Sequence, residues 1–174
     1  MINFADYRNL LLSDRTVRRF DSRVKIDKET LEHLVELTRY CASGRNAQPL
    51  RYYLANTPSD CDKIYPLLKW AGYYSDWDGP EPDERPVAYL IQCLDTEFGP
   101  NCLCDDGLQL QSITLGATTL GLGCCIIKAF NAPALSETLS IPERYVPCYV
   151  LALGKPAEEV KIEDMADDDT ADFK

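Results

Sequence analysis

Residues 43–49 read Ser-Gly-Arg-Asn-Ala-Gln-Pro, and they follow a segment, residues 27–41, whose apolar side chains recur at helical spacing. The Ser-Gly pair and Pro49 predict a helix end followed by a rigid turn. The amide side chains of Asn46 and Gln48 can both donate and accept hydrogen bonds, which suits the polar edge of a planar heterocycle. Taken alone, the same residues could form an ordinary polar surface loop.

A basic segment, Arg15-Thr16-Val17-Arg18-Arg19-Phe20, lies upstream of that loop. Arg15, Thr16 and Arg18 bring two guanidinium groups and a hydroxyl close together in the chain. A phosphate monoester carries nearly two negative charges and needs charge-assisted donors held near one another, which this segment can provide. A surface-exposed basic turn is the alternative interpretation.

The order and separation of the two segments resemble those of the FMN-dependent nitroreductase family. The basic segment is similar to the family's Arg-Ser-x-Arg phosphate-binding turn, and residues 42–49 are similar to its Pro-Ser-x-x-Asn-x-Gln-Pro flavin loop. Asp14 stands where the family usually has a base, which removes one cation beside the phosphate. The resemblance implies that two groups of residues bind FMN: Arg15, Thr16 and Arg18 at the phosphate, and Ser43, Arg45, Asn46 and Gln48 at the ring.

Two later segments extend the resemblance to residue 156. Leu120-Gly121-Leu122-Gly123 is similar to the family's glycine turn, which implies that Gly121, Leu122 and Gly123 approach the flavin through their backbone. A helix C-cap is the alternative interpretation of these glycines. The turn Gly154-Lys155-Pro156 resembles the end of the family's last core strand, which implies that Lys155 reaches the phosphate. The thiols of Cys124-Cys125, unusual at this place, are expected only to pack.

The pattern along the chain predicts a single α+β domain over residues 1–174. The resemblance implies a nitroreductase-like fold, with a central, mostly antiparallel sheet of four to five strands flanked by helices. Helices are expected over residues 4–12, 27–41, 61–70, 105–120 and 132–139, and strands over 51–55, 87–94, 123–128 and 148–153. Three prolines in residues 79–86 argue against regular structure there. The helix over 105–120 is apolar on nearly every face, so a second subunit is a plausible cover.

Net charge is −10 for 174 residues, and it is distributed unevenly. An acidic protein is not expected to bind nucleic acid, whereas the bases concentrated in residues 1–56 suit a small anionic ligand. A solvated charged surface is the other reading of those bases. No apolar run approaches the roughly 20 residues that span a bilayer. Without a signal-peptide pattern, a cytoplasmic protein is the simplest expectation.

Residues 157–174 form an acidic C-terminal extension, the acidic tail. Val160 and Ile162 alternate with charged residues, which predicts a short edge strand added to a partner's sheet. Beyond Met165 the run of acids is expected to stay solvated and mobile. The aromatic residues of segment 70–77 could form a lid over a flavin or a patch covering the core.

Eight cysteines and a single histidine, His33, limit the chemistry that the chain itself can supply. The cysteine spacing fits neither a zinc site nor an iron–sulfur cluster, so buried free thiols and no metal are expected. No Gly-x-Gly-x-x-Gly fingerprint for a tightly held dinucleotide is present.

The resemblance therefore implies a homodimeric NAD(P)H-dependent FMN oxidoreductase. Such an enzyme takes hydride at flavin N5 and passes electrons to a nitroaromatic or quinone-like acceptor, without a catalytic acid or base from the protein. A flavin-binding protein that serves storage, sensing or flavin breakdown is the first alternative. A structural domain without a cofactor is the second.

Overall fold

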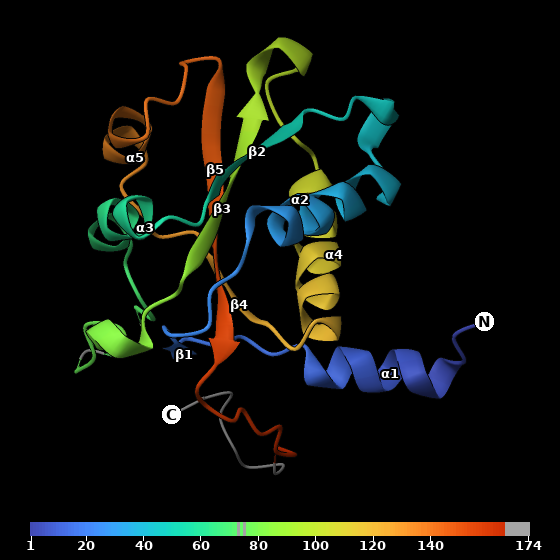
Figure 1. The fold of residues 1–174 in the computed structure, drawn as a ribbon. Helices are drawn as coiled ribbons and strands as arrows, with labels where there is room; N and C mark the ends of the chain where they lie inside the picture. Colours follow the sequence, from blue (N-terminus) through green and yellow to red (C-terminus); the bar gives the residue numbers. More distant parts are fainter. Residues whose placement is uncertain (73, 75, 166–174) are drawn as a thin grey trace.

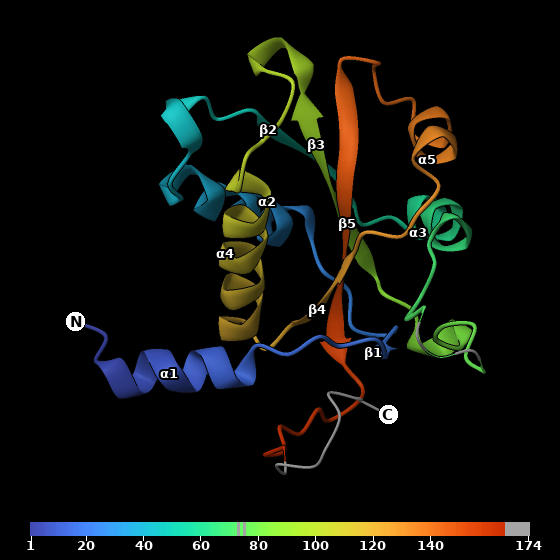
Figure 2. The same cartoon turned by 180° about the vertical axis from the view of Figure 1, so that it is seen from behind.

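An antiparallel sheet runs through the centre of the molecule, and helices cover both of its faces (Figure 1 and Figure 2). The computed structural model describes residues 1–72, 74 and 76–165. The strands are β1 (Phe20–Asp21), β2 (Leu50–Ala55), β3 (Ala88–Asp95), β4 (Gly123–Ile127) and β5 (Tyr145–Pro156). Their order is β1-β5-β3-β2, with β4 paired to β5, and these pairings are antiparallel. The predicted α+β class with a mostly antiparallel sheet is confirmed.

The helices are α1 (Phe4–Ser13), α2 (Lys28–Glu36), α3 (Pro58–Ile64), α4 (Asp105–Thr119) and α5 (Ala132–Thr138). Figure 1 shows α2 and α4 on one face of the sheet, α3 and α5 on the other, and α1 projecting from the lower end of α4. Side-chain oxygens cap four of the helix N-termini, which satisfies backbone N–H groups that no helical carbonyl can reach. The capping residues are Asn3, Asp27, Thr57 and Asn131.

β3 occupies the middle of the sheet because its side chains can be buried on both faces. All of Ala88–Asp95 is buried, and the strand pairs with β2 on one side and β5 on the other. Tyr89 and Ile91 belong to the core under α3 and α5, whereas Leu90 belongs to the core under α2 and α4. The nearly unbroken apolar run over 87–94 predicted a buried strand but not its place in the sheet.

Several predicted boundaries are wrong, and local chemistry explains each difference. The helix expected over 61–70 begins earlier, at Pro58, because Thr57 caps it and proline is well tolerated in a first helical turn. Pro66 lies in a 3₁₀ turn, Tyr65–Leu67, that follows. Residues 79–86 are not wholly irregular, since Pro82–Glu84 forms a 3₁₀ turn. The helix expected over 27–41 is α-helical only to Glu36 and ends in 3₁₀ geometry.

The cysteines are free, but only half of them are buried as expected. Cys61, Cys93, Cys124 and Cys125 are buried, Cys104 is exposed, and Cys41, Cys102 and Cys148 are half-buried. Burial raises the pKa of the Cys125 thiol to about 11 and that of Cys124 further still. These two remain protonated thiols with little nucleophilic character, which agrees with the expectation that they only pack.

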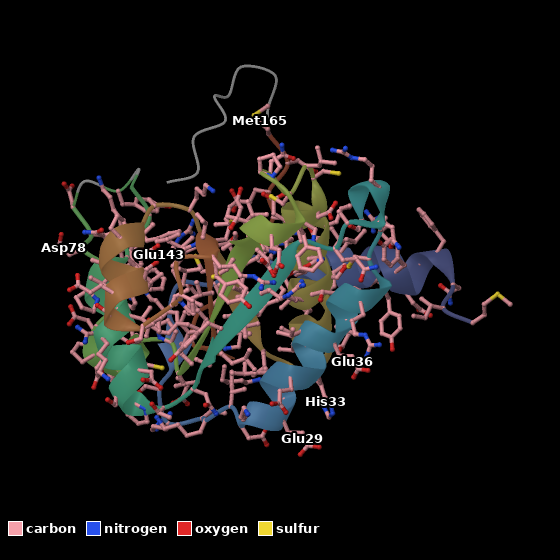
Figure 3. The ribbon with its side chains drawn as sticks, turned by 90° about the horizontal axis from the view of Figure 1, so that it is seen from above. Glu29, His33, Glu36, Asp78, Glu143 and Met165 are labelled. Atoms are coloured by element: carbon pink, nitrogen blue, oxygen red, sulfur yellow. The ribbon has the colours of Figure 1, made fainter. Side chains whose placement is uncertain are left out.

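The outer face of α2 carries the only histidine of the chain. Figure 3 shows Glu29, His33 and Glu36 along this face, pointing away from the body of the molecule. His33 Nε2 lies 3.9 Å from Glu29 Oε1, and both side chains are largely exposed. His33 is therefore a surface residue remote from the candidate site described below.

α4 is covered on one face only in this single chain. Its buried residues include Leu110, Ile113 and Ala117, whereas Leu108 is 44% and Leu120, just past its end, 57% exposed. α1 has no buried residue at all. The expectation that α4 is covered on all sides is therefore not met within one copy, and large apolar side chains remain at its surface.

The acidic tail continues β5 without forming a strand of its own over residues 157–165. Val160 and Ile162 are 42% and 54% exposed, so in one copy they pair with no strand of their own chain. The expectation about the acids beyond Met165 falls on residues 166–174, outside the described part of the chain. Over the described residues, none of the helices has both the length and the apolar content to span a bilayer.

A buried ion pair joins the end of β3 to the start of β5. Arg144 donates to both carboxylate oxygens of Asp95, at 2.6 and 2.7 Å, and Arg51 Nη2 lies 3.6 Å from the same carboxylate. The Asp95 side chain has no exposed surface. The hydrogen bonds from Arg144 hold the pKa of Asp95 below its usual value.

We expect this pair to make folding stability depend on pH in the acid range. Because the folded-state pKa of Asp95 is depressed, its contribution is complete above the unfolded-state pKa, about 3.9, and is lost as pH falls through the folded-state value. Asp95→Asn should lower the free energy of unfolding at neutral pH and flatten its decline below about pH 4. Urea unfolding of both proteins across this range measures the effect; parallel pH profiles would contradict it.

Candidate functional site

The basic segment predicted to bind phosphate, residues 15–19, lies against the start of β4, and we call it the arginine turn. Thr16 forms a parallel bridge with Cys124, and Val17 N–H donates to Cys124 O at 2.9 Å. Val17 is buried, whereas Thr16 is exposed. This pairing fixes the backbone of the turn and leaves the Thr16 hydroxyl facing solvent.

The guanidinium groups of the two predicted phosphate-binding arginines differ in their hydrogen bonds. Arg15 folds back on α1, with Nη2 donating to Leu11 O at 2.7 Å, while its buried Nε has no hydrogen-bond partner. Arg18 is half-buried, and no hydrogen bond or ion pair of its guanidinium occurs among the described residues. Thr16 and Arg18 therefore keep free donors, and Arg15 keeps an orphaned one.

Asp14, which replaces the family's usual base, is bonded to α4. Its carboxylate accepts hydrogen bonds from Gln111 Nε2 and Thr114 Oγ1, both at 2.7 Å, and from Thr118 Oγ1 at 3.4 Å. These bonds satisfy the carboxylate and join the end of α1 to α4. Asp14 thus places a fixed negative charge beside the arginine turn.

The Gly121–Gly123 turn lies next to the arginine turn, but two of its amides are engaged in ending α4. Gly121 has φ +69°, its N–H donates to Thr118 O, and Leu122 N–H donates to Ala117 O, which is the hydrogen-bond pattern of a Schellman cap. Gly123 permits close packing, since a Cβ there would lie 2.8 Å from the Val17 side chain. Capping and packing account for these glycines, and a role for Gly121, Leu122 and Gly123 at a flavin stays a prediction.

Lys155 and Glu158 complete this end of the site. Lys155 Nζ donates to Gly121 O at 3.2 Å, so the predicted cation does lie beside the turn. Glu158, which sequence analysis missed, accepts the backbone N–H groups of Arg18 and Arg19 on its Oε1. Nothing in the sequence pattern indicates this contact, because Glu158 is far from both arginines along the chain.

The second predicted cluster, residues 43–48, forms a strained turn that we call the polar loop. Arg45, Asn46 and Gln48 have φ values of 54°, 54° and 49°, a left-handed conformation that non-glycine residues seldom adopt. Such strain persists only where surrounding contacts fix the backbone, and it concentrates at functional sites. The exposed amides of Asn46 and Gln48 bond each other, with Gln48 Nε2 donating to Asn46 Oδ1 at 2.8 Å.

Asp105 at the start of α4 holds the polar loop in place, and sequence analysis missed it. Its buried carboxylate accepts Ser43 Oγ–H at 2.6 Å and Gly44 N–H at 2.9 Å. Ser43 Oγ also accepts Gln48 N–H at 2.9 Å. The Ser43 hydroxyl therefore organises the loop, while the side chains of Arg45, Asn46 and Gln48 remain exposed.

An open cleft of about 310 Å³ separates the polar loop from the segment before α4. Arg45 and Pro49 line one wall, and Phe98, Cys102 and Leu103 line the other. This volume lies at the lower end of the roughly 300–1,000 Å³ typical of ligand pockets.

The two clusters lie at opposite ends of α4 (Figure 1). The polar loop is bonded to Asp105 at its first residue, and Gly121 follows its last turn beside Lys155. A helix of 15 residues is about 22 Å long. One copy of the chain therefore brings together Thr16, Arg18, Gly121 and Lys155, but not these residues with Asn46 and Gln48.

Both tryptophans of the aromatic segment 70–77 pack against the core, and a lid over a flavin stays a prediction. Trp70 is only 5% exposed and belongs to the core under α3 and α5. Trp77 packs partly against that core, and its ring lies 5.9 Å from the Arg19 guanidinium carbon. Residues 73 and 75 are outside the described part of the chain.

Comparison with known proteins links this geometry to one family. The model of the Nitroreductase family matches residues 12–85 and 104–155, more than half of the chain. A protein of Bacillus subtilis (strain 168) named as an NAD(P)H nitroreductase, YdgI, is 25% identical over 193 residues, which cover 91% of this chain and 92% of that protein. The matched regions include the arginine turn, the polar loop and the glycine turn.

Solved structures share the fold. A nitroreductase family protein of Streptococcus pneumoniae is 15% identical, with a TM-score of 0.76 over 92% of this chain and 95% of that one. A nitroreductase of Exiguobacterium sibiricum, solved in complex with FMN, is 20% identical, with a TM-score of 0.75 over 97% of both chains. The predicted nitroreductase-like fold is confirmed, and the chain belongs to the nitroreductase family.

Proposed function

We propose that the protein is an FMN-dependent oxidoreductase that uses NAD(P)H to reduce an electron-poor acceptor such as a nitroaromatic or quinone. Membership of the nitroreductase family supports an oxidoreductase. The name of the Bacillus subtilis relative supports NAD(P)H as the reductant, and the Exiguobacterium structure supports FMN as the cofactor. When bound, FMN supplies the redox chemistry by accepting hydride at N5 and passing electrons to the acceptor.

The observation that carries the proposal is the group of donors at the arginine turn. Among the described residues, the Thr16 hydroxyl and the Arg18 guanidinium have no hydrogen-bond partner, and neither does the buried Arg15 Nε. Lys155 uses one N–H on Gly121 O. Hydroxyl, guanidinium and ammonium groups together suit a terminal phosphate. The donor set therefore fits the phosphate of FMN, with Asp14 and Glu158 as opposing charges.

The polar loop would hold the ring of a flavin whose phosphate lies on another copy of the chain. Its exposed amides suit the pyrimidine edge of the isoalloxazine ring. A five-carbon ribityl chain is much shorter than α4, about 22 Å, so the two ends of one copy cannot serve the same flavin. We therefore infer a homodimer in which each site combines the arginine turn of one chain with the polar loop of its partner.

Exposed apolar side chains around α1 and α4 support this arrangement. In one copy they remain in water, although a second copy could cover them. They are Met1, Ile2, Phe4, Tyr7, Leu12, Tyr40, Leu103, Leu108 and Leu120. Figure 2 shows α1 and α4 together at one side of the molecule, and α4 runs between the two ends of the proposed site.

The chain would contribute binding, orientation and exclusion of water instead of acid–base groups. Arg18 and Lys155 would neutralise the phosphate, and the Thr16 hydroxyl would donate a hydrogen bond to it. Asn46 and Gln48 would orient the ring, and the cleft beside the polar loop would shelter its edge. His33 lies elsewhere on the surface, and the buried thiols of Cys124 and Cys125 are protonated. No proton donor of the protein is needed for hydride transfer from a nicotinamide.

A flavin-binding protein without turnover is the second candidate. The specific observation that favours it is the pair of carboxylates, Asp14 and Glu158, at the predicted phosphate end. Anaerobic addition of NADH or NADPH to the flavin-loaded protein separates the two. Rapid bleaching of the flavin absorbance supports the oxidoreductase, and a flavin that stays oxidised with both nucleotides would leave only the binding protein.

Arg18→Ala is expected to weaken FMN binding by roughly ten- to a hundredfold, because it removes a charge-assisted contact worth about 1.5–3 kcal/mol. Fluorescence titration of the apoprotein with FMN measures the change. Lys63→Ala is the matched control, since it removes an exposed cation from α3, which contributes no residue to the predicted phosphate end. Equal affinity in the two variants would place the phosphate elsewhere, and FAD as the cofactor released on denaturation would contradict the proposal as well.

A further inference from the structure

The carboxylate of Glu158 accepts hydrogen bonds from backbone N–H groups of the arginine turn. Its Oε1 accepts Arg18 N–H at 2.5 Å and Arg19 N–H at 3.1 Å. The adjacent residue fixes the chain there, since Ala157 N–H donates to Arg19 O at 2.9 Å. Within residues 1–72, 74 and 76–165, no ion pair links this carboxylate to an arginine side chain, so it is bound by backbone amides alone.

Two successive N–H groups that converge on one oxygen form an anion-binding arrangement. An open cleft of about 340 Å³ adjoins it, lined by Arg18, Arg19, Tyr74, Trp77 and Glu158. An anion from solution can therefore approach the two amides, provided that the Glu158 side chain rotates away. Glu158 is half-buried at the cleft wall, so its side chain is partly accessible to solvent.

We propose that Glu158 is a specificity-determining residue. Its carboxylate competes with an anion from solution for the backbone N–H groups of Arg18 and Arg19. This inference rests on the proposed function, because the external competitor is the phosphate of the flavin. A phosphate oxygen and the Glu158 carboxylate cannot accept the same N–H groups, and two anions held close together repel each other. Asp14 adds a second negative charge that its bonds to α4 hold in place.

The consequence is a reduced contribution of the phosphate to flavin affinity. FMN and riboflavin share the ring and the ribityl chain, and they differ only in the phosphate. The ratio of their dissociation constants therefore isolates the phosphate end of the site from the ring end. In the wild-type protein we expect this ratio to be smaller than in a protein without the Glu158 charge.

Glu158→Gln tests this with little change of shape. Glutamine keeps an oxygen for the two N–H groups but removes the charge. We expect it to tighten FMN binding by on the order of tenfold, as the loss of a nearby like charge predicts, and to leave riboflavin binding unchanged. Glu159→Gln is the matched control, because Glu159 is exposed and the substitution changes the net charge equally. Fluorescence titration of the apoproteins with both flavins gives the ratios.

Each outcome decides the inference. One contrary result is a ratio of the riboflavin and FMN dissociation constants that is the same in Glu158→Gln as in Glu159→Gln, and another is weaker binding of FMN by Glu158→Gln. Either result would show that Glu158 only stabilises the backbone of the turn. Inorganic phosphate provides a second probe that needs no flavin: it should raise the melting temperature of Glu158→Gln more than that of Glu159→Gln. Equal shifts would also overturn the inference. If wild type and variants bind no flavin at all, the proposed function fails, and the phosphate measurement still decides the role of Glu158.

Discussion

Asp105→Ala should lower the free energy of unfolding by about 2 kcal/mol, since it leaves two half-buried donors without an acceptor, and each fully buried one would cost about 1–3 kcal/mol. The substitution removes the acceptor of both Ser43 Oγ–H and Gly44 N–H. Neither donor has another acceptor among the described contacts. Chemical denaturation of the purified protein measures the change.

The same substitution should abolish high-affinity flavin binding at the ring end. Three residues of the polar loop hold left-handed backbone conformations, each of which costs on the order of 1 kcal/mol or more. Without the Asp105 anchor, the loop can relax to ordinary conformations and its amides lose their arrangement. Because the ring end is affected, FMN and riboflavin should lose affinity to the same extent, in contrast to Arg18→Ala, which should affect FMN alone.

Asp106→Ala is the matched control for Asp105→Ala. Both acids lie in the first turn of α4, where they interact similarly with the helix dipole. The Asp106 carboxylate, however, accepts the N–H of the next residue, Gly107, and interacts with the Cys102 thiol. Among the described residues it has no hydrogen bond to the polar loop. An equal loss of stability and of riboflavin affinity in the two variants would show that the anchor is unimportant and that the helix terminus alone matters.

Local chemistry made much of the fold predictable. The apolar run before Asp95 predicts the central strand, and Asp27 at the start of an apolar-striped segment predicts the beginning of α2. β1 was missed because Phe20–Asp21 is only two residues long and becomes a strand solely by pairing with Lys155 and Pro156. Because β1 depends on pairing with residues far away in the chain, no local sequence pattern could predict it.

The candidate site was predictable in its residue types but not in its organisation. The motifs identified the arginine turn and the polar loop, yet the residues that fix them were missed. Asp105 anchors Ser43 across the chain, and Glu158 binds the amides of the arginine turn. The strained backbone at Arg45, Asn46 and Gln48 was also invisible, because positive φ values at non-glycine residues depend on tertiary contacts.

The separation of the two clusters by α4 makes a strong prediction about mixed dimers. Arg18→Ala is expected to weaken the proposed phosphate end of a site, and Asn46→Ala is expected to weaken the proposed ring end. If each site combines the two ends from different chains, a heterodimer of these variants contains one site with both defects and one intact site. Random mixing gives about half heterodimers, so about a quarter of all sites should regain full flavin affinity.

Co-refolding the two inactive variants, followed by FMN titration and sedimentation, measures this restoration. Each variant alone should bind FMN weakly at the same concentration. Mixing Arg18→Ala with wild type is the control for dilution, since wild-type chains then supply intact sites in known proportion. If both ends came from one chain, every site in the mixed sample would carry one defect, and no tight sites would appear. Restored binding would require two copies of the chain for each flavin, because a single copy holds the proposed phosphate donors and the proposed ring-binding amides at opposite ends of α4.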